Sequence, residues 1–304
     1  MTDNTVAWVK TGPASMALAY IGTDGKEIVR FDVKKYLSIT DPLNKNVTFT
    51  SVSLQNYLPF SEGLTPIKSN VSRECGFINK KLQLVIPVSF KDACPFSDGL
   101  AAVENEVGSW GFINTTGKLV IPYDYSQRPS RFMSGLARVE TKELRFGYIN
   151  KENKVVITPR YANATCFYKG FALAREGYDQ PINLIDSTGT VVATFPKDLL
   201  YIDNSKGPIG ISGGDQADYP FYVPETLRQL VDEGEGIFIK GMSYGVINNK
   251  GKVVLDFKYQ YLADLHGGKM FAHSTAFVNN STHNEMGIID EKGKWLVSIE
   301  NSGF

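Results

Sequence analysis

Three histidines and three cysteines are the side chains of this chain best suited to metal binding or nucleophilic catalysis. The histidines are seven and ten residues apart, so they form no HxxxH pair of the kind that binds zinc. The cysteines form no CxxC pair. We therefore expect no metal and no cofactor, histidines that face solvent or form hydrogen bonds, and buried, reduced thiols. These residues are His266, His273, His283, Cys75, Cys94 and Cys166.

Other patterns that support catalysis are also incomplete. The glycine-rich segment Gly210–Asp215 lacks the GxxxxGK[ST] sequence that cradles phosphates. Pairs of carboxylates, such as Asp232 with Glu233 or Asp203 with Asp218, have the acid and base groups of a glycosidase, but the sequence does not fix their separation. We predict no catalytic residues and a protein that is not an enzyme. An enzyme whose site is assembled from scattered residues is an alternative.

The charge balance argues against binding to nucleic acids or to anionic membranes. The chain has 304 residues, and its 32 Lys and Arg equal its 32 Asp and Glu. Residues 1–5 include no basic segment followed by an apolar run, and no stretch of 18 apolar residues occurs. We expect a cytoplasmic protein with no nucleic-acid partner and no membrane partner.

A repeated segment organises the chain. The sequence of residues 110–122, WGFINTTGKLVIP, returns in similar form, and its second residue serves as an anchor. Three successive anchor spacings are 35, 36 and 36 residues. A glycine recurs 23 or 24 residues after several of the anchors, within clusters such as Phe132–Ala137. The seven anchors are Ala19, Gly76, Gly111, Gly147, Asn183, Gly245 and Gly287.

Each repeat contains a predicted hairpin. The Gly-Phe-Ile-Asn run reads as a strand, and the Asn-x-x-Gly-Lys run as a tight turn in which Gly117 or Asn153 adopts positive φ. Asn or Asp before the turn is expected to bond its own backbone rather than a ligand, and the turn lysines to protect strand edges. These residues are Asn79, Asn114, Asn150, Asp186, Asn248 and Asp290, with Lys118, Lys154, Lys252 and Lys294.

A second and a third strand complete the unit. The returning strand follows the turn, and Pro87 and Pro122 are expected to end it because proline has no amide donor. The Gly135–Val139 run is the third strand. One unit cannot bury its aromatic face alone, so neighbouring units must stack around a shared core that includes Phe112, Ile113 and Ile149. We predict an all-β array of about seven three-stranded antiparallel units, as a curved solenoid or a propeller-like ring, in a single domain over residues 1–304.

The sequence resembles the bacterial WG-repeat family, which is named for a Trp-Gly pair like Trp110-Gly111. The similarity is clearest over residues 75–189 and 244–297. Only one copy keeps the tryptophan, and other apolar residues replace it elsewhere. The resemblance implies a β-repeat fold. It brings no catalytic residues, because the family is not tied to one activity.

Two insertions, at about 33–54 and 208–235, break the period. The first is expected to hold a loop and an extra strand. In the second, residues 224–233 have the Pro-Glu start and the i, i+3, i+4 apolar spacing of a short helix. Residues 213–235 contain six acidic residues and one Arg, a net charge of −5. Insertions in repeat proteins often form the binding face, although this one could instead cover a junction between repeats.

These features favour a cytoplasmic protein-binding module, and most concretely an immunity protein that neutralises a toxin. It would do so by steric occlusion of a basic active site, using the acidic, aromatic insertion. The predicted contact residues are Asp215, Asp218, Tyr219, Phe221, Tyr222, Asp232 and Glu233. The main alternative is a carbohydrate or cell-wall binding protein, since aromatic-rich β repeats offer surfaces on which sugars stack.

Overall fold

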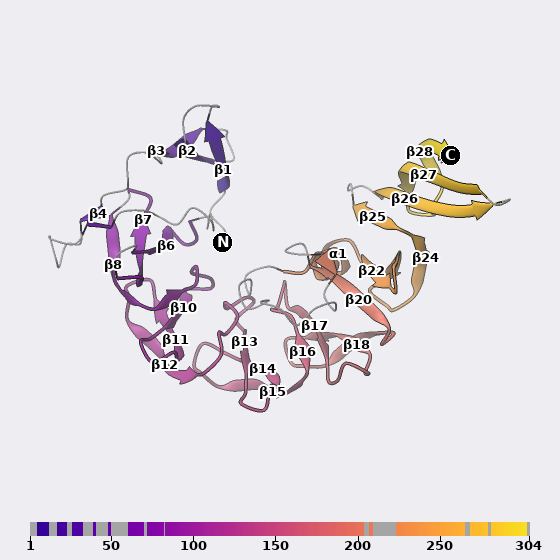
Figure 1. Cartoon of the computed structure of the whole chain (residues 1–304). Helices are drawn as coiled ribbons and strands as arrows, with labels where there is room; N and C mark the ends of the chain where they lie inside the picture. Colours follow the sequence, from indigo (N-terminus) through magenta and orange to yellow (C-terminus); the bar gives the residue numbers. More distant parts are fainter. Residues whose placement is uncertain are drawn as a thin grey trace. The chain divides into compact units, whose positions relative to one another are not determined.

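The computed structural model shows a nearly all-β chain with one short helix (Figure 1). It describes the strands at 5–11, 17–22, 27–32 (with residue 26), 39–40 and 48–49, and residues 60–203 apart from 70–71 and 82. It also describes residues 207–208, 223–264, 268–278 and 281–302. The chain forms two compact units, Met1–Leu144 with Tyr148–Val155, and Arg145–Gly147 with Val156–Phe304. No helix in these described ranges is long and apolar enough to cross a bilayer.

The first unit consists of short antiparallel sheets that follow one another along the chain. Their strands are β1 (Thr5–Thr11), β2 (Ala17–Gly22) and β3 (Glu27–Asp32); β4 (Ile39–Thr40) and β5 (Thr48–Phe49); β6 (Leu64–Lys68), β7 (Cys75–Asn79) and β8 (Leu84–Phe90); and β9 (Asp92–Ala93), β10 (Leu100–Glu104), β11 (Trp110–Asn114) and β12 (Leu119–Tyr125). The boundary between the units runs through the next sheet, which contains β13 (Ala137–Glu140), β14 (Phe146–Ile149) and β15 (Val155–Tyr161).

The second unit continues the pattern and adds the helix α1 (Glu225–Asp232). Its strands are β16 (Asn163–Ala164), β17 (Phe171–Arg175), β18 (Ile182–Asp186) and β19 (Val191–Phe195); β20 (Leu199–Asp203), β21 (Gly207–Pro208), β22 (Glu235–Lys240), β23 (Ser243–Asn248) and β24 (Val253–Tyr259); and β25 (Tyr261–Asp264), β26 (Lys269–Val278), β27 (Ser281–Asp290) and β28 (Trp295–Ser302).

The seven predicted repeats are confirmed. Every anchor lies on a strand that has a sheet neighbour on each side: β2, β7, β11, β14, β18, β23 and β27. Several units add to the predicted three strands a two-residue strand, such as β9 or β16. The predicted helix is present, and β4 and β5 lie within the first insertion.

The hairpin turns form as the sequence predicts. In each of the six turns, the side-chain oxygen of the Asn or Asp accepts hydrogen bonds of 2.9–3.2 Å from the amides two and four residues later. Gly117 has φ of 83°, and Asn153 takes the same left-handed conformation with φ of 60°. These side chains are therefore part of the turn, not a row of ligands.

The anchor glycine has a different role, because its φ is not positive. A Cβ placed on Gly111 would lie 2.6 Å from the carbonyl oxygen of Ile121, and one on Gly76 would lie 2.7 Å from that of Ile86. The strand pairing shifts register on either side of this contact, as it does between Trp110 and Phe112. In these two repeats the anchor must be glycine because the bulged returning strand crosses it at backbone distance.

The expectation that proline ends the returning strand is wrong. Pro87 lies inside β8 and Pro122 inside β12, and pairing resumes beyond them at Phe90 and Tyr125. The bulge leaves backbone groups unpaired at this point, so an amide is not needed there and proline fits within the strand.

Stacked sheets share apolar clusters, as predicted. In the first unit, Phe77 and Ile86 of one sheet pack with Phe96 and Ile113 of the next. The three residues predicted to lie in the core, Phe112, Ile113 and Ile149, are at most 1% exposed. The described strands therefore bury their apolar residues between consecutive sheets, and no sheet forms a closed core by itself.

We expect Gly111→Ala to lower the free energy of unfolding by about 2–3 kcal/mol, because its Cβ would overlap the Ile121 carbonyl. The matched control is Gly135→Ala, whose Cβ has no neighbour within 4 Å and which has φ of 79°. It should cost about 1 kcal/mol, from backbone strain alone. Urea denaturation followed by circular dichroism measures both. Equal losses would contradict a steric role for the anchor.

Candidate functional site

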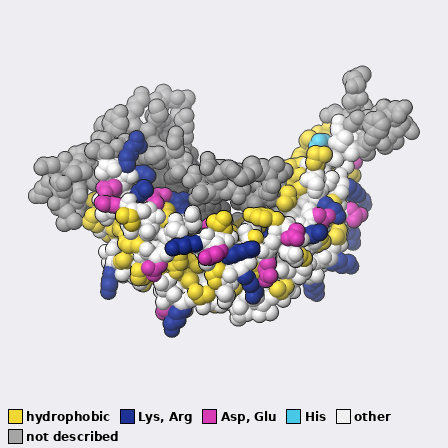
Figure 2. Space-filling model, turned by 60° about the horizontal axis from the view of Figure 1, so that its bottom comes forward, with side chains coloured by type: hydrophobic (Ala, Val, Ile, Leu, Met, Phe, Trp, Pro, Cys, Tyr) yellow, Lys and Arg dark blue, Asp and Glu magenta, His cyan; other side chains and the backbone are white. Residues whose placement is uncertain are grey.

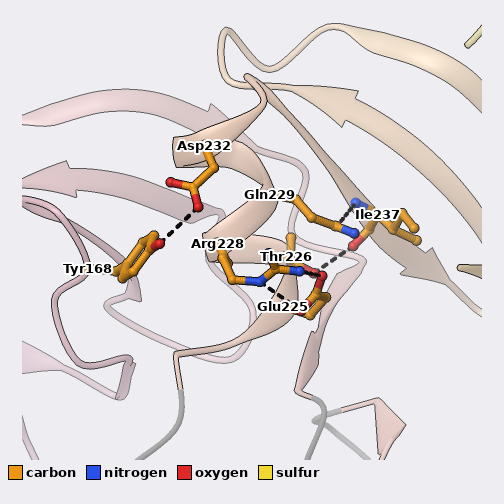
Figure 3. Close-up of polar contacts among 7 residues, drawn as sticks. All are labelled: Tyr168, Glu225, Thr226, Arg228, Gln229, Asp232 and Ile237. Carbon is orange, nitrogen blue, oxygen red and sulfur yellow. Dashed lines mark hydrogen bonds and ion pairs between the residues drawn. The ribbon is translucent and has the colours of Figure 1, made fainter. Parts of the chain in front are cut away.

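Helix α1 is the part of the second insertion that the structure describes best, and it is attached to the sheet by buried contacts (Figure 3). Leu227 and Leu230 are buried in a cluster with Phe238 and Leu199. Gly236 on β22 permits this close approach, since a Cβ there would lie 2.9 Å from Leu230 Cγ. The helix therefore forms part of the core between two repeats.

Two buried side chains of the helix complete the edge of strand β22. The Thr226 hydroxyl donates a 2.6 Å hydrogen bond to the Ile237 carbonyl, and Gln229 Oε1 accepts a 3.0 Å bond from the Ile237 amide (Figure 3). Strand β20 pairs with β22 only from Phe238 onward. The two side chains thus replace a strand partner at Ile237, which explains why polar residues are buried here.

The C-terminal end of the helix is held by Asp232. Its Oδ2 accepts a 2.8 Å hydrogen bond from the Tyr168 hydroxyl (Figure 3). Its Oδ1 lies 2.8 Å from Lys169 Nζ. The hydrogen bond from Lys169 lowers the pKa of the Asp232 carboxyl. Partial burial, and then the Asp232 carboxylate, raise the pKa of Tyr168. Asp232 is therefore a charged group that links α1 to the turn between β16 and β17.

This link occupies a turn position that other repeats use differently. Glu62 and Asp98, at the equivalent turn position, each accept a hydrogen bond from the glycine amide of the next turn, Gly99 and Gly135. Lys169 holds that position in its own repeat and shares the left-handed φ. The positive charge of Lys169 attracts the acidic C-terminal end of α1. A carboxylate at this position, such as Glu62 and Asp98 provide in their own repeats, would repel it. The change from Glu or Asp to Lys before the recurring glycine is visible in the sequence, but our predictions did not use it to locate this contact.

The structure describes two of the seven predicted partner contacts. Asp232 is bound to Tyr168 and Lys169, and Glu233 is an exposed residue that ends the helix. Asp232 therefore belongs to the attachment of α1, and Glu233 caps its C-terminal end through its backbone amide. The other five, Asp215, Asp218, Tyr219, Phe221 and Tyr222, lie outside the described residues, as does the Gly210–Asp215 segment.

The described residues that could do other chemistry lie apart or are buried. Among those residues, no group of three His, Cys, Asp or Glu side chains could hold a metal ion. His273 pairs with Met286 and His283 with Ala276, at separate points of the β26–β27 hairpin, and His266 lies outside the described residues. All three cysteines are buried, and none of them forms a disulfide. Burial raises the pKa of Cys75 and Cys94 to about 12, so both thiols are protonated at neutral pH.

A second surface recurs on the returning strands. The two residues before the buried position of each strand form what we term the outer pair, and most of its members are exposed aliphatics. The returning strand ends its sheet in the strand order, so its outer edge is free of sheet neighbours in the described residues. The exposed members are Val85, Leu119, Val120, Val155, Val156, Val191, Val192 and Val253.

Figure 2 shows a face of the molecule on which basic and acidic side chains alternate with apolar ones. An exposed turn lysine precedes several outer pairs, as Lys118 precedes Leu119 and Lys154 precedes Val155. This surface is apolar with isolated charges, and it differs from the acidic composition of the second insertion.

The fold and these surfaces define an all-β repeat protein, and comparison with protein families gives the repeat type. Residues 76–106, 110–144, 146–178 and 244–272 match the family described as "WG containing repeat". These four segments are WG repeats, which confirms the resemblance seen at Trp110-Gly111. No curated protein matches the sequence.

Solved structures resemble the chain only weakly. BamB from Moraxella catarrhalis has a TM-score of 0.43 at 11% identity and covers 100% of this chain and 87% of its own. KlHsv2 with loop 6CD replaced by a Gly-Ser linker has 0.40 at 10%, with coverage of 95% and 92%. The WD40 beta propeller domain of Doa1 has 0.32 at 10%, with 90% of each chain covered. TM-scores below 0.5 do not identify a shared fold.

We expect Asp232→Asn to lower the melting temperature at pH 7 by a few degrees and to speed amide exchange in α1, because it removes the charge opposite Lys169. The folded-state pKa of Asp232 is lowered, so its stabilisation is present above the unfolded pKa of about 4 and is lost as pH falls below it. The difference from the wild type should therefore shrink at acidic pH. The exposed Asp179→Asn is the control, and a difference that persists at low pH would contradict the ionic link.

Proposed function

We propose that this WG-repeat chain is a protein-binding scaffold and not an enzyme. The observation that supports binding is the exposed outer pair, which recurs from repeat to repeat on strands that end their sheets. Exposed aliphatic side chains that recur in this way are typical of surfaces that contact another protein. Within each compact unit the stacked sheets hold the pairs at fixed intervals, so a partner gains area without ordering the scaffold.

The composition of the outer pairs favours a protein partner over a sugar. Sugars stack on exposed aromatic rings, whereas the exposed outer-pair residues are valine and leucine. The large exposed aromatic side chains among the described residues are Tyr178 and Tyr261, and neither belongs to an outer pair. A carbohydrate-binding role therefore has less support.

In its more specific form, we propose that the chain is a cytoplasmic immunity protein that occludes a toxin with a basic surface. The net charge of −5 over residues 213–235 supports a basic partner. The attachment of α1 also supports it, because Thr226, Gln229 and Asp232 fix the C-terminal end of this acidic segment to the sheet. Residues near such an anchored helix lose less conformational freedom when they bind.

The proposed binding function is tested by co-purifying the chain with proteins encoded by neighbouring genes and then measuring its affinity for any partner found. We expect the double variant Val120→Lys/Val192→Lys to weaken binding at least about tenfold, since it places charges in two outer pairs. Val107→Lys is the control, because Val107 is exposed in the β10–β11 hairpin, away from the outer pairs. If no partner is found, or if both variants bind as the wild type does, the proposed surface is wrong.

The immunity role has its own test, which uses association kinetics with the toxin. The double variant Asp215→Asn/Asp218→Asn should slow association about tenfold at low salt and by less at high salt, because charge attraction steers encounter. Glu106→Gln removes an exposed charge outside the insertion and should leave the rate unchanged. Equal rates for the three proteins would rule out steering by the insertion.

A further inference from the structure

The hairpin turns of the first compact unit carry a positive charge. These turns span residues 79–83, 114–118 and 150–154. Together they contain five Lys and one Glu, a net charge of +4, whereas the whole chain is neutral. Lys118 and Lys154 are exposed, and among the described residues neither forms an ion pair with a carboxylate. Their charges can therefore attract a partner.

Each turn rests on the returning strand of the preceding repeat. A Cβ on Gly117 would lie 3.2 Å from Ile86 Cγ2, and the Tyr125 hydroxyl donates a hydrogen bond to Asn153 Oδ1. The turn of one repeat therefore lies against the strand that carries the previous outer pair, so that turn lysines and exposed aliphatic pairs alternate. We term this alternating surface the outer strip; it comprises residues 79–85, 114–120 and 150–155.

The second unit keeps this geometry but has less charge in its turns. A Cβ on Gly189 would lie 3.3 Å from Ile157 Cγ2, as the Gly117 turn lies against Ile86. The turns at 186–190, 248–252 and 290–294 contain four Lys, two Asp and one Glu, a net charge of +1. The positive charge beside the outer pairs is therefore concentrated in the first unit.

We propose that the outer strip binds a segment of another protein in which aliphatic residues recur with acidic residues between them. The inference rests on the proposed binding function and names the chemistry of the partner. Exposed valine and leucine contact aliphatic side chains of the segment, and the turn lysines attract its carboxylates. This surface is separate from the acidic second insertion.

Other occupants match the outer strip less well. A second copy of this chain would bring its own turn lysines to the contact, and like charges facing one another oppose binding. Lysines also discourage a neutral strand from pairing with a sheet edge. A nucleic acid would satisfy the lysines through its phosphates, but phosphates do not cover exposed aliphatic side chains. An acidic, aliphatic polypeptide satisfies both components of the strip.

The spacing of the sheets sets the spacing of residues in the partner. Stacked sheets lie about 10 Å apart, and an extended chain advances about 3.3 Å per residue. An extended segment that runs along the outer strip therefore passes one repeat about every three residues. We expect one aliphatic residue and at least one carboxylate in each such triplet.

The test uses a labelled peptide of four Val-Glu-Ser triplets and the full chain, with binding measured by fluorescence anisotropy. We expect saturable binding that weakens between about 50 mM and about 500 mM salt, because the charges are exposed. Peptides with Gln in place of Glu, or with Ser in place of Val, should each bind at least about fivefold more weakly. If the Gln peptide binds equally well, the lysines are not used; if the Ser peptide does, the contact is one of charge alone. Either result overturns the proposal.

Lysine variants identify the surface. Lys118→Gln/Lys154→Gln should weaken peptide binding about fivefold at low salt. The turns should stay intact, because Asn114 and Asn150 bond the backbone amides at these positions. The matched control removes the same charge from exposed lysines outside the turns, and it should bind as the wild type does; it is Lys68→Gln/Lys142→Gln.

A valine variant tests the apolar component of the strip. Val85→Ser/Val120→Ser should weaken peptide binding at least about fivefold, because it removes exposed aliphatic groups from two outer pairs. A peptide that does not bind, or that binds the lysine variant and its control equally, overturns this inference. The broader binding function is then still decided by co-purification, which does not depend on an acidic partner.

Discussion

The crossing of the returning strand over the anchor glycine is the interaction on which the glycine-anchored repeats depend. The returning backbone passes so close to Gly76, Gly111 and Gly147 that a single added carbon would meet a carbonyl oxygen at 2.6–2.7 Å. A second register shift, between Phe77 and Ile78 and between Phe112 and Ile113, places Ile86 and Ile121 in the core and leaves Val85 and Val120 exposed. Core packing and surface composition in these repeats therefore follow from two neighbouring shifts of the returning strand.

The exposed aliphatic pairs follow from this geometry. Val120 and Ile121 are adjacent residues of similar type, yet one is exposed and the other is fully buried. Stability within the repeat accounts for Ile121, because it packs between sheets. It does not account for Val120, whose apolar side chain is exposed to solvent, and the proposed contact of the outer pairs with another protein supplies a reason for it.

The second insertion shows how the array of β repeats accommodates an inserted helix. Helix α1 replaces a strand neighbour at Ile237 through Thr226 and Gln229, so the edge of β22 keeps its hydrogen bonds. A charge reversal in the adjacent turn, from the carboxylates at Glu62 and Asp98 to Lys169, lets the helix end bind through Asp232. The insertion is thus integrated into the stack and not simply appended to it.

The sequence by itself determined the features that depend on neighbours within a few residues: the seven anchors, the Asx-bonded turns, the positive φ of Gly117 and Asn153, and helix α1. Only the tertiary structure decided the rest. Pro87 and Pro122 lie within strands because of a bulge against another strand, and Asp232 binds Lys169 from 63 residues away. Local hydrogen bonds join residues a few positions apart, so short sequence patterns predict them. Burial and long-range charge pairing depend on contacts between distant segments, which no local pattern predicts.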